Sequence, residues 1–259
     1  MSKIIAVHSY KGGTGKTLLS VNLAASLAKR GKKVCIFDLD FRAPSLFAIL
    51  KVEKAEHWCN DYLNNVVDIN SVLVDLSSRV SGNSNFYAVL ANPATEAIRD
   101  MSSKDRKWEM RALGRLLALK ETLLKDQKFD YLFFDTSPGL QYSSINAIVA
   151  ADFVIVATTG DRSDVDGTKR MLQELYNLFE KKTGLVLNKA LETSATARKA
   201  EMSAKVKTVY QVPMLGIVPC FCEILRAEGN LIFAQDKPDH PFTRIISEMA
   251  RKIDGDELD

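Results

Sequence analysis

The sequence predicts a single α/β domain built on one doubly wound, mostly parallel β-sheet with helices on both faces. Three observations support this prediction. Short apolar, β-branched runs alternate with longer helical patterns along the 259 residues. Several runs, among them VCIF, YLFF and FVIVA, are apolar throughout, which is typical of strands covered on both faces. No repeat or low-complexity linker divides the chain, and a domain of this length can bury one large core.

The predicted strands and helices alternate in the order that such a fold requires. Strands are expected at Ile4–His8, Lys33–Asp38, Phe86–Ala91, Tyr131–Asp135, Phe153–Thr158, Gly184–Leu187 and Met214–Val218. Helices are expected at Thr17–Arg30, Arg106–Lys125, Asp164–Lys181, Ala197–Tyr210 and Pro241–Ile253. Right-handed crossovers through these helices would wind the chain onto both faces of the sheet. We expect one domain over residues 1–259, with 254–259 as an acidic, disordered tail.

Composition excludes several classes of protein. Hydrophobic residues make up 46% and charged residues 26%, which is too apolar for a disordered chain. No apolar run is long enough for a transmembrane helix, and the N-terminal residues 1–8 are too weakly basic for a secretory signal. The net charge of +3 does not by itself indicate a nucleic-acid or membrane partner. The sparse cysteines suit free thiols in a reducing compartment, so we expect a cytoplasmic protein.

A glycine-rich loop joins the first expected strand to the first expected helix. It reads Lys11-Gly12-Gly13-Thr14-Gly15-Lys16-Thr17, and Leu18 follows it in the helix. Glycines permit conformations that turn several N–H groups inward, and the positive end of the helix adds to the attraction for an anion. We expect Lys16 to contact the β- and γ-phosphates of a nucleotide and the Thr17 hydroxyl to ligate Mg²⁺. The loop therefore predicts a nucleotide phosphate site.

Three aspartates follow apolar strands at the carboxyl edge of the predicted sheet, where ligands of open α/β sheets bind. Asp38 and Asp40 end the second strand, and Asp135 ends YLFF ahead of Thr136-Ser137-Pro138-Gly139. A buried carboxylate is costly unless it is paired, and Mg²⁺ held through water is a suitable partner for Asp135. Helix capping is the alternative interpretation, for the first two ahead of Pro44 and for Asp135 as an N-cap.

These motifs resemble those of one family of ATPases. Tyr10 replaces a glycine of the general G-x-x-x-x-G-K-[ST] form, and Lys11 is an additional lysine. K-G-G-x-G-K-T resembles the deviant Walker A motif of the MinD/ParA family, which includes Mrp-like, nitrogenase-iron-protein-like and arsenite-pump ATPases. The run D-x-D-x-x-x-P-S-L resembles its switch I, and D-x-x-P-G from Asp135 resembles its Walker B strand and switch II. The resemblance extends from Lys3 to Ile253 and is poor over residues 51–104.

The resemblance implies a slow ATPase that binds ATP or ADP with Mg²⁺ and acts as a molecular switch. It implies that the switch dimerises around ATP and positions or segregates a cellular cargo. Lys11 would contact the partner's nucleotide and act with Lys16 in catalysis, while Asp40 would orient the attacking water. Asp38 and Asp135 would support Mg²⁺ or its water shell. A solvated loop lysine is the alternative for Lys11.

The resemblance also assigns the other end of the nucleotide. Asn188 follows the strand GLVL, where the family uses an asparagine to pair with the adenine edge. Pro219 follows GIV, where the family's backbone lines the base. A turn residue is the alternative interpretation for Asn188. An activating or cargo protein is implied as a partner, and the sequence does not identify it.

Cys220 and Cys222 raise a second function, that of an ATP-dependent metal or iron–sulfur cluster carrier or maturation factor. Two thiolates from each of two subunits would form a four-cysteine site, although a C-x-C pair alone is weak support.

Two further surfaces concern partners. A basic set resembles the surface with which ParA-like members bind DNA non-specifically, and a solvated face is the alternative. It comprises Lys181, Lys182, Arg198, Lys199, Lys205 and Lys207. The apolar stripe from Phe242 to Ile253 resembles a MinD-like membrane helix. The acidic residues after it disfavour an anionic lipid surface, so we expect this helix to pack in the core.

Overall fold

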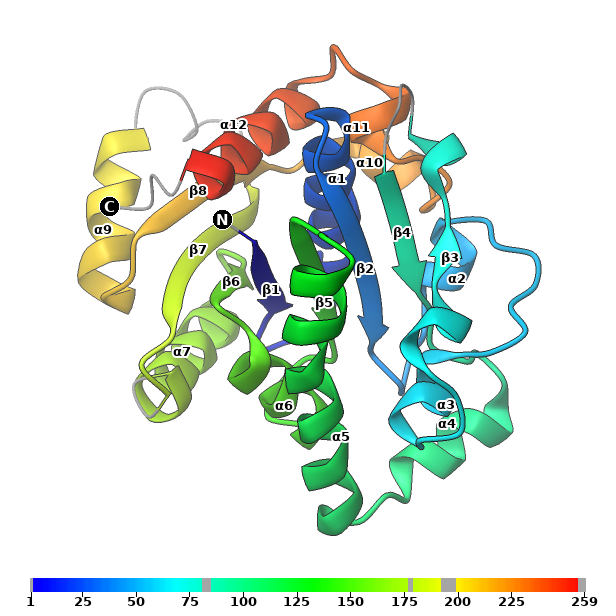
Figure 1. Cartoon of the computed structure of the whole chain (residues 1–259). Coiled ribbons are helices and arrows are strands. Elements are labelled where there is room, and N and C mark those ends of the chain that lie inside the picture. Colours follow the sequence, from blue (N-terminus) through cyan, green and yellow to red (C-terminus); the bar gives the residue numbers. More distant parts are fainter. Residues whose placement is uncertain (1, 81–84, 177–178, 192–198, 256–259) are drawn as a thin grey trace.

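The computed structural model describes residues 2–80, 85–176, 179–191 and 199–255. Its strands are β1 (Lys3–His8), β2 (Lys33–Leu39), β3 (Val74–Asp75), β4 (Asn85–Val89), β5 (Tyr131–Thr136), β6 (Phe153–Thr158), β7 (Lys182–Ala190) and β8 (Met214–Pro219). Within these ranges they form one eight-stranded sheet in the order β3-β4-β2-β5-β1-β6-β7-β8. Neighbouring strands run parallel except for the edge pair β3 and β4. The predicted doubly wound sheet with helices on both faces is confirmed (Figure 1).

The helices follow most of the predicted pattern. They are α1 (Lys16–Lys29), α2 (Leu46–Ile49), α3 (Cys59–Leu63), α4 (Thr95–Ser102), α5 (Arg106–Leu119), α6 (Tyr142–Ala150), α7 (Arg162–Met171), α9 (Lys199–Tyr210), α10 (Cys222–Arg226), α11 (Phe233–Asp236) and α12 (Pro241–Gly255). Short 3₁₀ turns form η1 (Ile69–Val72) and η2 (Ser77–Arg79). The π-helical turns η3 (Lys120–Asp126) and η4 (Leu172–Tyr176) extend α5 and α7, so these predicted helices change their winding part-way.

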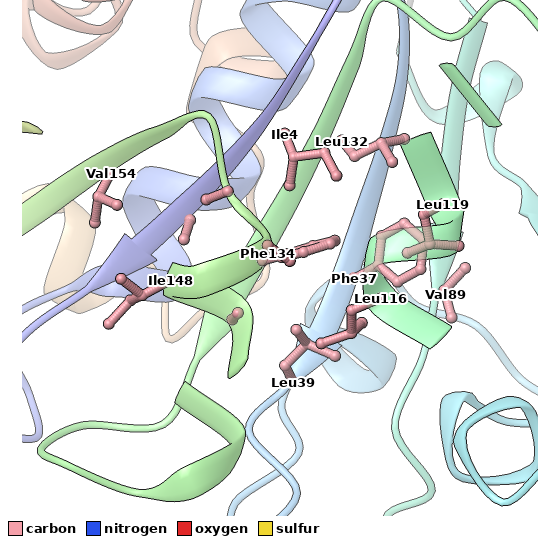
Figure 2. Close-up of a cluster of buried hydrophobic side chains, with 14 of the residues drawn as sticks. Ile4, Phe37, Leu39, Val89, Leu116, Leu119, Leu132, Phe134, Ile148 and Val154 are labelled. Atoms are coloured by element: carbon pink, nitrogen blue, oxygen red, sulfur yellow. The ribbon is translucent and has the colours of Figure 1, made fainter. Parts of the chain in front are cut away.

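The sheet is covered on both faces by apolar side chains, as the continuously apolar strands predict. On one face, Phe37 and Phe134 pack edge to face with ring centroids 5.3 Å apart (Figure 2). Leu116 and Leu119 of α5 and Ile148 of α6 belong to the same cluster. The opposite face packs against α1 and α12, which also contact each other. Burial on both faces fixes the register of the strands, and the register fixes where their polar ends lie.

The C-terminal helix packs in the core, as expected. Phe242, Ile246, Met249 and Ile253 of α12 are buried, and Ile245 packs partly against the same cluster. Asp254 and Gly255, the first residues of the predicted tail, lie within α12, and residues 256–259 fall outside the described ranges. In the described part of the chain, none of the helices is both long and apolar enough to cross a membrane.

The register also brings the predicted aspartates together. Asp38 of β2 lies directly beside Asp135 of β5 in the parallel ladder. On its other side, Asp135 pairs with Val7 of β1, one residue before the end of that strand. The carboxyl ends of these central strands therefore lie next to the loop that enters α1.

Candidate functional site

The glycine-rich loop has the backbone conformation that an anion site requires. Gly13 and Gly15 have φ angles of +76° and +93°, in the left-handed region that favours glycine. Gly15 is the N-cap of α1, and the first turn of that helix holds no acidic residue. The first turn of a helix leaves backbone N–H groups without helical partners, so the positive end of α1 next to this loop favours a bound anion.

Lys16 places a buried ammonium group beside this loop. The residue is only 7% exposed, and its Nζ donates a hydrogen bond to Ser9 Oγ at 3.0 Å. Burial lowers the pKa of Lys16, and the charges of Asp135, Asp40 and Asp164 oppose that change. No carboxylate lies within ion-pair distance of this ammonium group among the described residues. Lys16 therefore carries a cation whose desolvation is only partly compensated, which suits an anionic ligand.

Asp135 lies next to the first turn of α1. Thr17 Oγ1 is 2.6 Å from Asp135 Oδ2 and donates to it, while Ser20 Oγ donates to the other carboxyl oxygen at 2.9 Å. Burial raises the pKa of Asp135 to about 6, against the opposing effect of these hydrogen bonds and of Lys16. A hydroxyl and a carboxylate in contact are oxygen ligands of the kind that Mg²⁺ prefers. This carboxylate caps no helix, so the N-cap interpretation does not describe it.

Asp38 and Asp40 have different surroundings. Asp38 is fully buried, and its carboxylate accepts hydrogen bonds from the backbone N–H groups of Asp40, Ser45 and Leu46. Burial, followed by the charge of Asp135, raises the pKa of Asp38 well above its usual range. The helix-capping interpretation therefore describes Asp38, which holds the start of α2 and the segment before it. Its support of Mg²⁺ stays a prediction.

Asp40 faces the cavity beside the glycine loop. Its Oδ1 accepts hydrogen bonds from Ser137 Oγ at 2.8 Å and from the backbone N–H of Ala43 at 3.2 Å. The first contact joins the segment after β2 to the segment after β5. A carboxylate in this position can accept a proton from, or orient, a water molecule in the cavity.

Lys11 is partly exposed but is not a freely solvated loop lysine. Its side chain is 44% exposed, and Nζ lies 3.0 Å from Asp161 Oδ1 and donates also to Ser163 Oγ. Asp161 caps α7 by accepting from the backbone N–H groups of Ser163 and Asp164. Hydrogen bonds from Ser163 and Lys11 lower the pKa of Asp161 below its usual range. No sequence pattern indicates this contact, because its partners lie 150 residues or more from Lys11.

A cavity of about 580 Å³ runs from the glycine loop to an apolar end formed by residues after β8. Its lining contains most of the predicted nucleotide-binding residues, namely Gly12, Gly13, Gly15, Lys16, Thr17, Leu18, Asn188 and Pro219, together with Asp40. Thr14 is buried and lines a neighbouring hollow with Lys11. Phe221, Ile224 and Leu225 supply the apolar end. The cavity therefore joins a cationic phosphate-type site to a site suited to a flat apolar ring.

Several residues of this site escaped sequence reasoning. Ser9 and Ser137 hold Lys16 and Asp40 through single hydroxyl contacts, and serine is too common to be a signal. Arg42 lines the cavity from the predicted switch I segment. Lys189 lines it directly after Asn188, and its donation to the carbonyl of Gly13 at 2.8 Å has no counterpart in the motif.

The remaining predicted features lie outside this arrangement. Cys220 and Cys222 are exposed free thiols, and among the described residues no three His, Cys, Asp or Glu side chains could hold a metal ion. A site shared between two copies stays a prediction. Within the basic set, Lys181 donates to the carbonyls of Val149 and Ala151 at the end of α6, and Arg198 lies outside the described residues. The DNA-binding role of this set also stays a prediction.

The chain is similar in sequence and in fold to several known proteins. A family model described as an AAA domain matches residues 2–193. The chain is similar to the septum site-determining protein MinD of Thermotoga maritima, with 26% identity over 99% of this chain and 89% of that protein. It is 32% identical to the sporulation initiation inhibitor protein Soj of Bacillus subtilis, over 76% and 75% of the two chains. Its fold resembles that of MinD from Pyrococcus horikoshii, solved with Mg-ADP, with a TM-score of 0.76 and 22% identity, covering 98% and 96% of the chains.

Proposed function

Because the chain belongs to the AAA-domain family, and within it to the MinD/ParA P-loop ATPases, we propose that it is an ATP-dependent molecular switch. In this proposal it binds Mg²⁺-ATP, dimerises around it, and hydrolyses it slowly until a partner protein stimulates turnover. The observation that carries the proposal is the buried ammonium of Lys16 beside a loop with two left-handed glycines. The ammonium lies beside the start of α1, and in the described ranges none of the carboxylates comes within ion-pair distance of it.

The residues of the cavity fit a nucleoside triphosphate. The loop and Lys16 would hold the β- and γ-phosphates, and the apolar end near Phe221 would receive the base. Asn188 also lines this cavity, but its amide is already hydrogen-bonded to the Thr14 carbonyl and the Lys189 N–H, so pairing with the base would require it to exchange one of these contacts. Because Phe221 and its neighbours give the base end an apolar surface, a purine ring would replace water there favourably.

Thr17 and Asp135 fit a magnesium site, because their oxygens are already in contact at the foot of the loop. When bound, Mg²⁺ neutralises charge that develops on the transferred phosphoryl group. Asp40 would orient the attacking water, since it is the predicted carboxylate that both lines the cavity and connects the two switch segments. Loss of the γ-phosphate would then release both segments together.

Lys11 supports the dimeric part of the proposal. It extends from the loop to Asp161 and Ser163 rather than into the cavity of its own chain. In a dimer it would exchange these partners for phosphates bound to the other copy. Lys11→Ala should therefore abolish ATP-dependent dimerisation while lowering the affinity of the monomer for ATP less than threefold.

The relatives suggest what the switch does in the cell. The names of MinD and Soj refer to choosing a septum site and to inhibiting sporulation initiation, and we propose that this chain likewise positions a cellular cargo in the cytoplasm.

The proposal is tested by measuring phosphate release and oligomeric state with Mg²⁺-ATP, for the wild type and for Asp40→Ala. We expect slow release by the wild type and an accumulated ATP-bound dimer of the variant. Monomers in both samples at saturating ATP would contradict dimerisation, and the absence of phosphate release by the wild type would contradict hydrolysis. Co-sedimentation of the Asp40→Ala dimer with DNA and with liposomes would then identify the surface on which the cargo is positioned.

A further inference from the structure

The end of β7 has an irregularity next to the glycine loop. Leu187 pairs with Ile217 of β8 and Ala190 pairs with Pro219, so β7 has one residue more than β8 over this stretch. Lys189 has a φ angle of +56°, in the left-handed region that a lysine rarely adopts. In a regular strand, residues 188 and 189 would point to opposite faces. A bulge of this kind redirects a side chain and often occurs beside a functional site.

The consequence is that two successive side chains reach the same loop. Asn188 Nδ2 donates to the carbonyl oxygen of Thr14 at 2.7 Å, and Lys189 Nζ donates to the carbonyl oxygen of Gly13 at 2.8 Å. Two neighbouring residues of β7 therefore hold two neighbouring carbonyls of the loop. The amide of Asn188 is oriented in turn by the backbone N–H of Lys189, which donates to its Oδ1 at 2.9 Å.

A hydrogen bond to a backbone carbonyl also fixes the orientation of the N–H group in the same peptide unit. The peptide unit is planar and trans, so its C=O and N–H point in opposite directions. The contact from Lys189 to the Gly13 carbonyl therefore sets the direction of the Thr14 N–H, and the contact from Asn188 sets that of the Gly15 N–H. Those N–H groups belong to the predicted phosphate site, and the carbonyls are held from the β7 side of the loop.

The loop needs such support because its glycines make it easy to rearrange. Gly13 and Gly15 flank Thr14, and a glycine adopts either sign of φ at little cost, so the two peptide units between them can rotate readily. The packing is also close, since a Cβ atom on Gly15 would lie 2.3 Å from Asn188 Nδ2. Lys189 lines both the nucleotide cavity and the hollow next to it, so it lies beside the glycine loop.

We propose that Lys189 is a positioning residue for phosphate binding, which acts by holding the Gly13 peptide unit in the orientation that directs the following N–H toward the phosphates. This inference rests on the proposed nucleotide site and adds a residue to it. An alternative is that Lys189 contacts the base or ribose directly, since it follows the residue expected at the base. The two roles differ in the part of the ligand that they affect.

The test compares Lys189→Met, Lys189→Arg and the control Lys107→Met, which removes an exposed lysine of α5 far from the loop in sequence. Calorimetry would give the affinity of each variant for ATP, ADP and inorganic pyrophosphate. We expect Lys189→Met to bind all three about five- to tenfold more weakly, because one hydrogen bond from a charged donor to the loop is lost. Lys189→Arg, which can still donate to the carbonyl, should stay within about twofold of the wild type, as should the control.

Steady-state kinetics add a second measurement. Because the Gly13 peptide is held in both the ground state and the transition state, Lys189→Met should raise KM by a similar factor and leave kcat within about twofold. The inference would be overturned if Lys189→Met bound all three ligands as tightly as the wild type does. It would also be overturned if the variant lost affinity for ATP and ADP but not for pyrophosphate, since Lys189 would then act on the base or ribose. Equal melting temperatures of the three variants and the wild type would exclude unfolding as the cause of a loss. A wild type that binds none of the three ligands would instead refute the proposed function.

Discussion

Replacing Lys16 by methionine should have opposite effects on ligand binding and on stability. Methionine is unbranched and only one atom shorter, but it removes the ammonium, which is buried and has a neutral hydroxyl as its hydrogen-bond acceptor. The lowered pKa of Lys16, caused first by burial, indicates that the free chain is destabilised by this charge. We expect the free energy of unfolding to rise by about 1 kcal/mol, which corresponds to a melting temperature roughly 2–4 °C higher.

The same substitution should nearly abolish nucleotide binding. A bound triphosphate would be left facing a thioether where it had a desolvated cation, and truncating one partner of such a pair costs about 2–5 kcal/mol. The affinity should therefore fall by a factor on the order of 30 to several thousand. Calorimetric titration with Mg²⁺-ATP and denaturant unfolding of the same preparation would measure both effects. Affinity equal to that of the wild type would refute the phosphate site. A loss of more than about 1 kcal/mol of stability would mean that the ammonium supports the free fold instead.

Three other substitutions test separate parts of the structure. Asp40→Ala should slow single-turnover phosphate release by about a hundredfold while ATP affinity stays within threefold, and unchanged release would remove its assigned role. Gly15→Ala should destabilise the chain by about 1–3 kcal/mol in urea unfolding, because it forces a left-handed alanine against Asn188; a neutral result would contradict the close packing. Partial burial is the largest single influence on Asp254 and opposes its ionisation, but the hydrogen bonds from Lys32 and Tyr131 and the charges of Lys32 and Arg30 together outweigh it and hold the pKa of Asp254 below its usual range. The pKa of Asp254 is therefore lower in the folded than in the unfolded chain, so its ionised carboxylate adds under about 1 kcal/mol to the free energy of unfolding at pH 7. This contribution should be lost as the pH falls below about 4. If Asp254→Asn and the wild type lose the same stability between these pH values, the contribution is refuted.

The parts of the fold that the sequence predicts well are those that burial on two faces dictates. The strands YLFF and FVIVA are apolar throughout, and they form β5 and β6 in the middle of the sheet. The edge strand β3 is only Val74–Asp75, too short for a periodic pattern to indicate it. Helix α6 was not predicted, because its sequence YSSINAIVA combines small polar residues with a continuous apolar end. Hydrophobic periodicity is therefore a weak indicator of a helix or strand that is short or is buried on several sides.

The candidate site likewise has one part that the sequence predicts and one part that it does not. Its motifs have recognisable spacings, so the sequence could predict that Lys16, Thr17 and Asp40 lie around one cavity, and their roles there stay predictions. The contacts that orient them join distant segments through common residue types. Lys189 meets the glycine loop across 176 positions, and nothing in the dipeptide Asn-Lys indicates a bulge or a left-handed φ. Such contacts depend on the register of β7 against β8, which tertiary packing determines.

The geometry of the free chain is consistent with the proposed switch. Lys16, Asp38 and Asp135 are ionisable groups held away from water, and burial shifts the pKa of each toward its neutral form. The fold therefore bears an electrostatic cost in the region where the segments after β2 and β5 meet. A ligand that brings phosphates to Lys16 and a cation to Asp135 would relieve that cost. The hydrogen bond from Ser137 to Asp40 joins the segment after β5 to the segment after β2. A cation bound at Asp135 would therefore change the constraint on both segments. Coupling of this kind requires no distant pathway, because the groups that bind the ligand also hold the segments that respond to it.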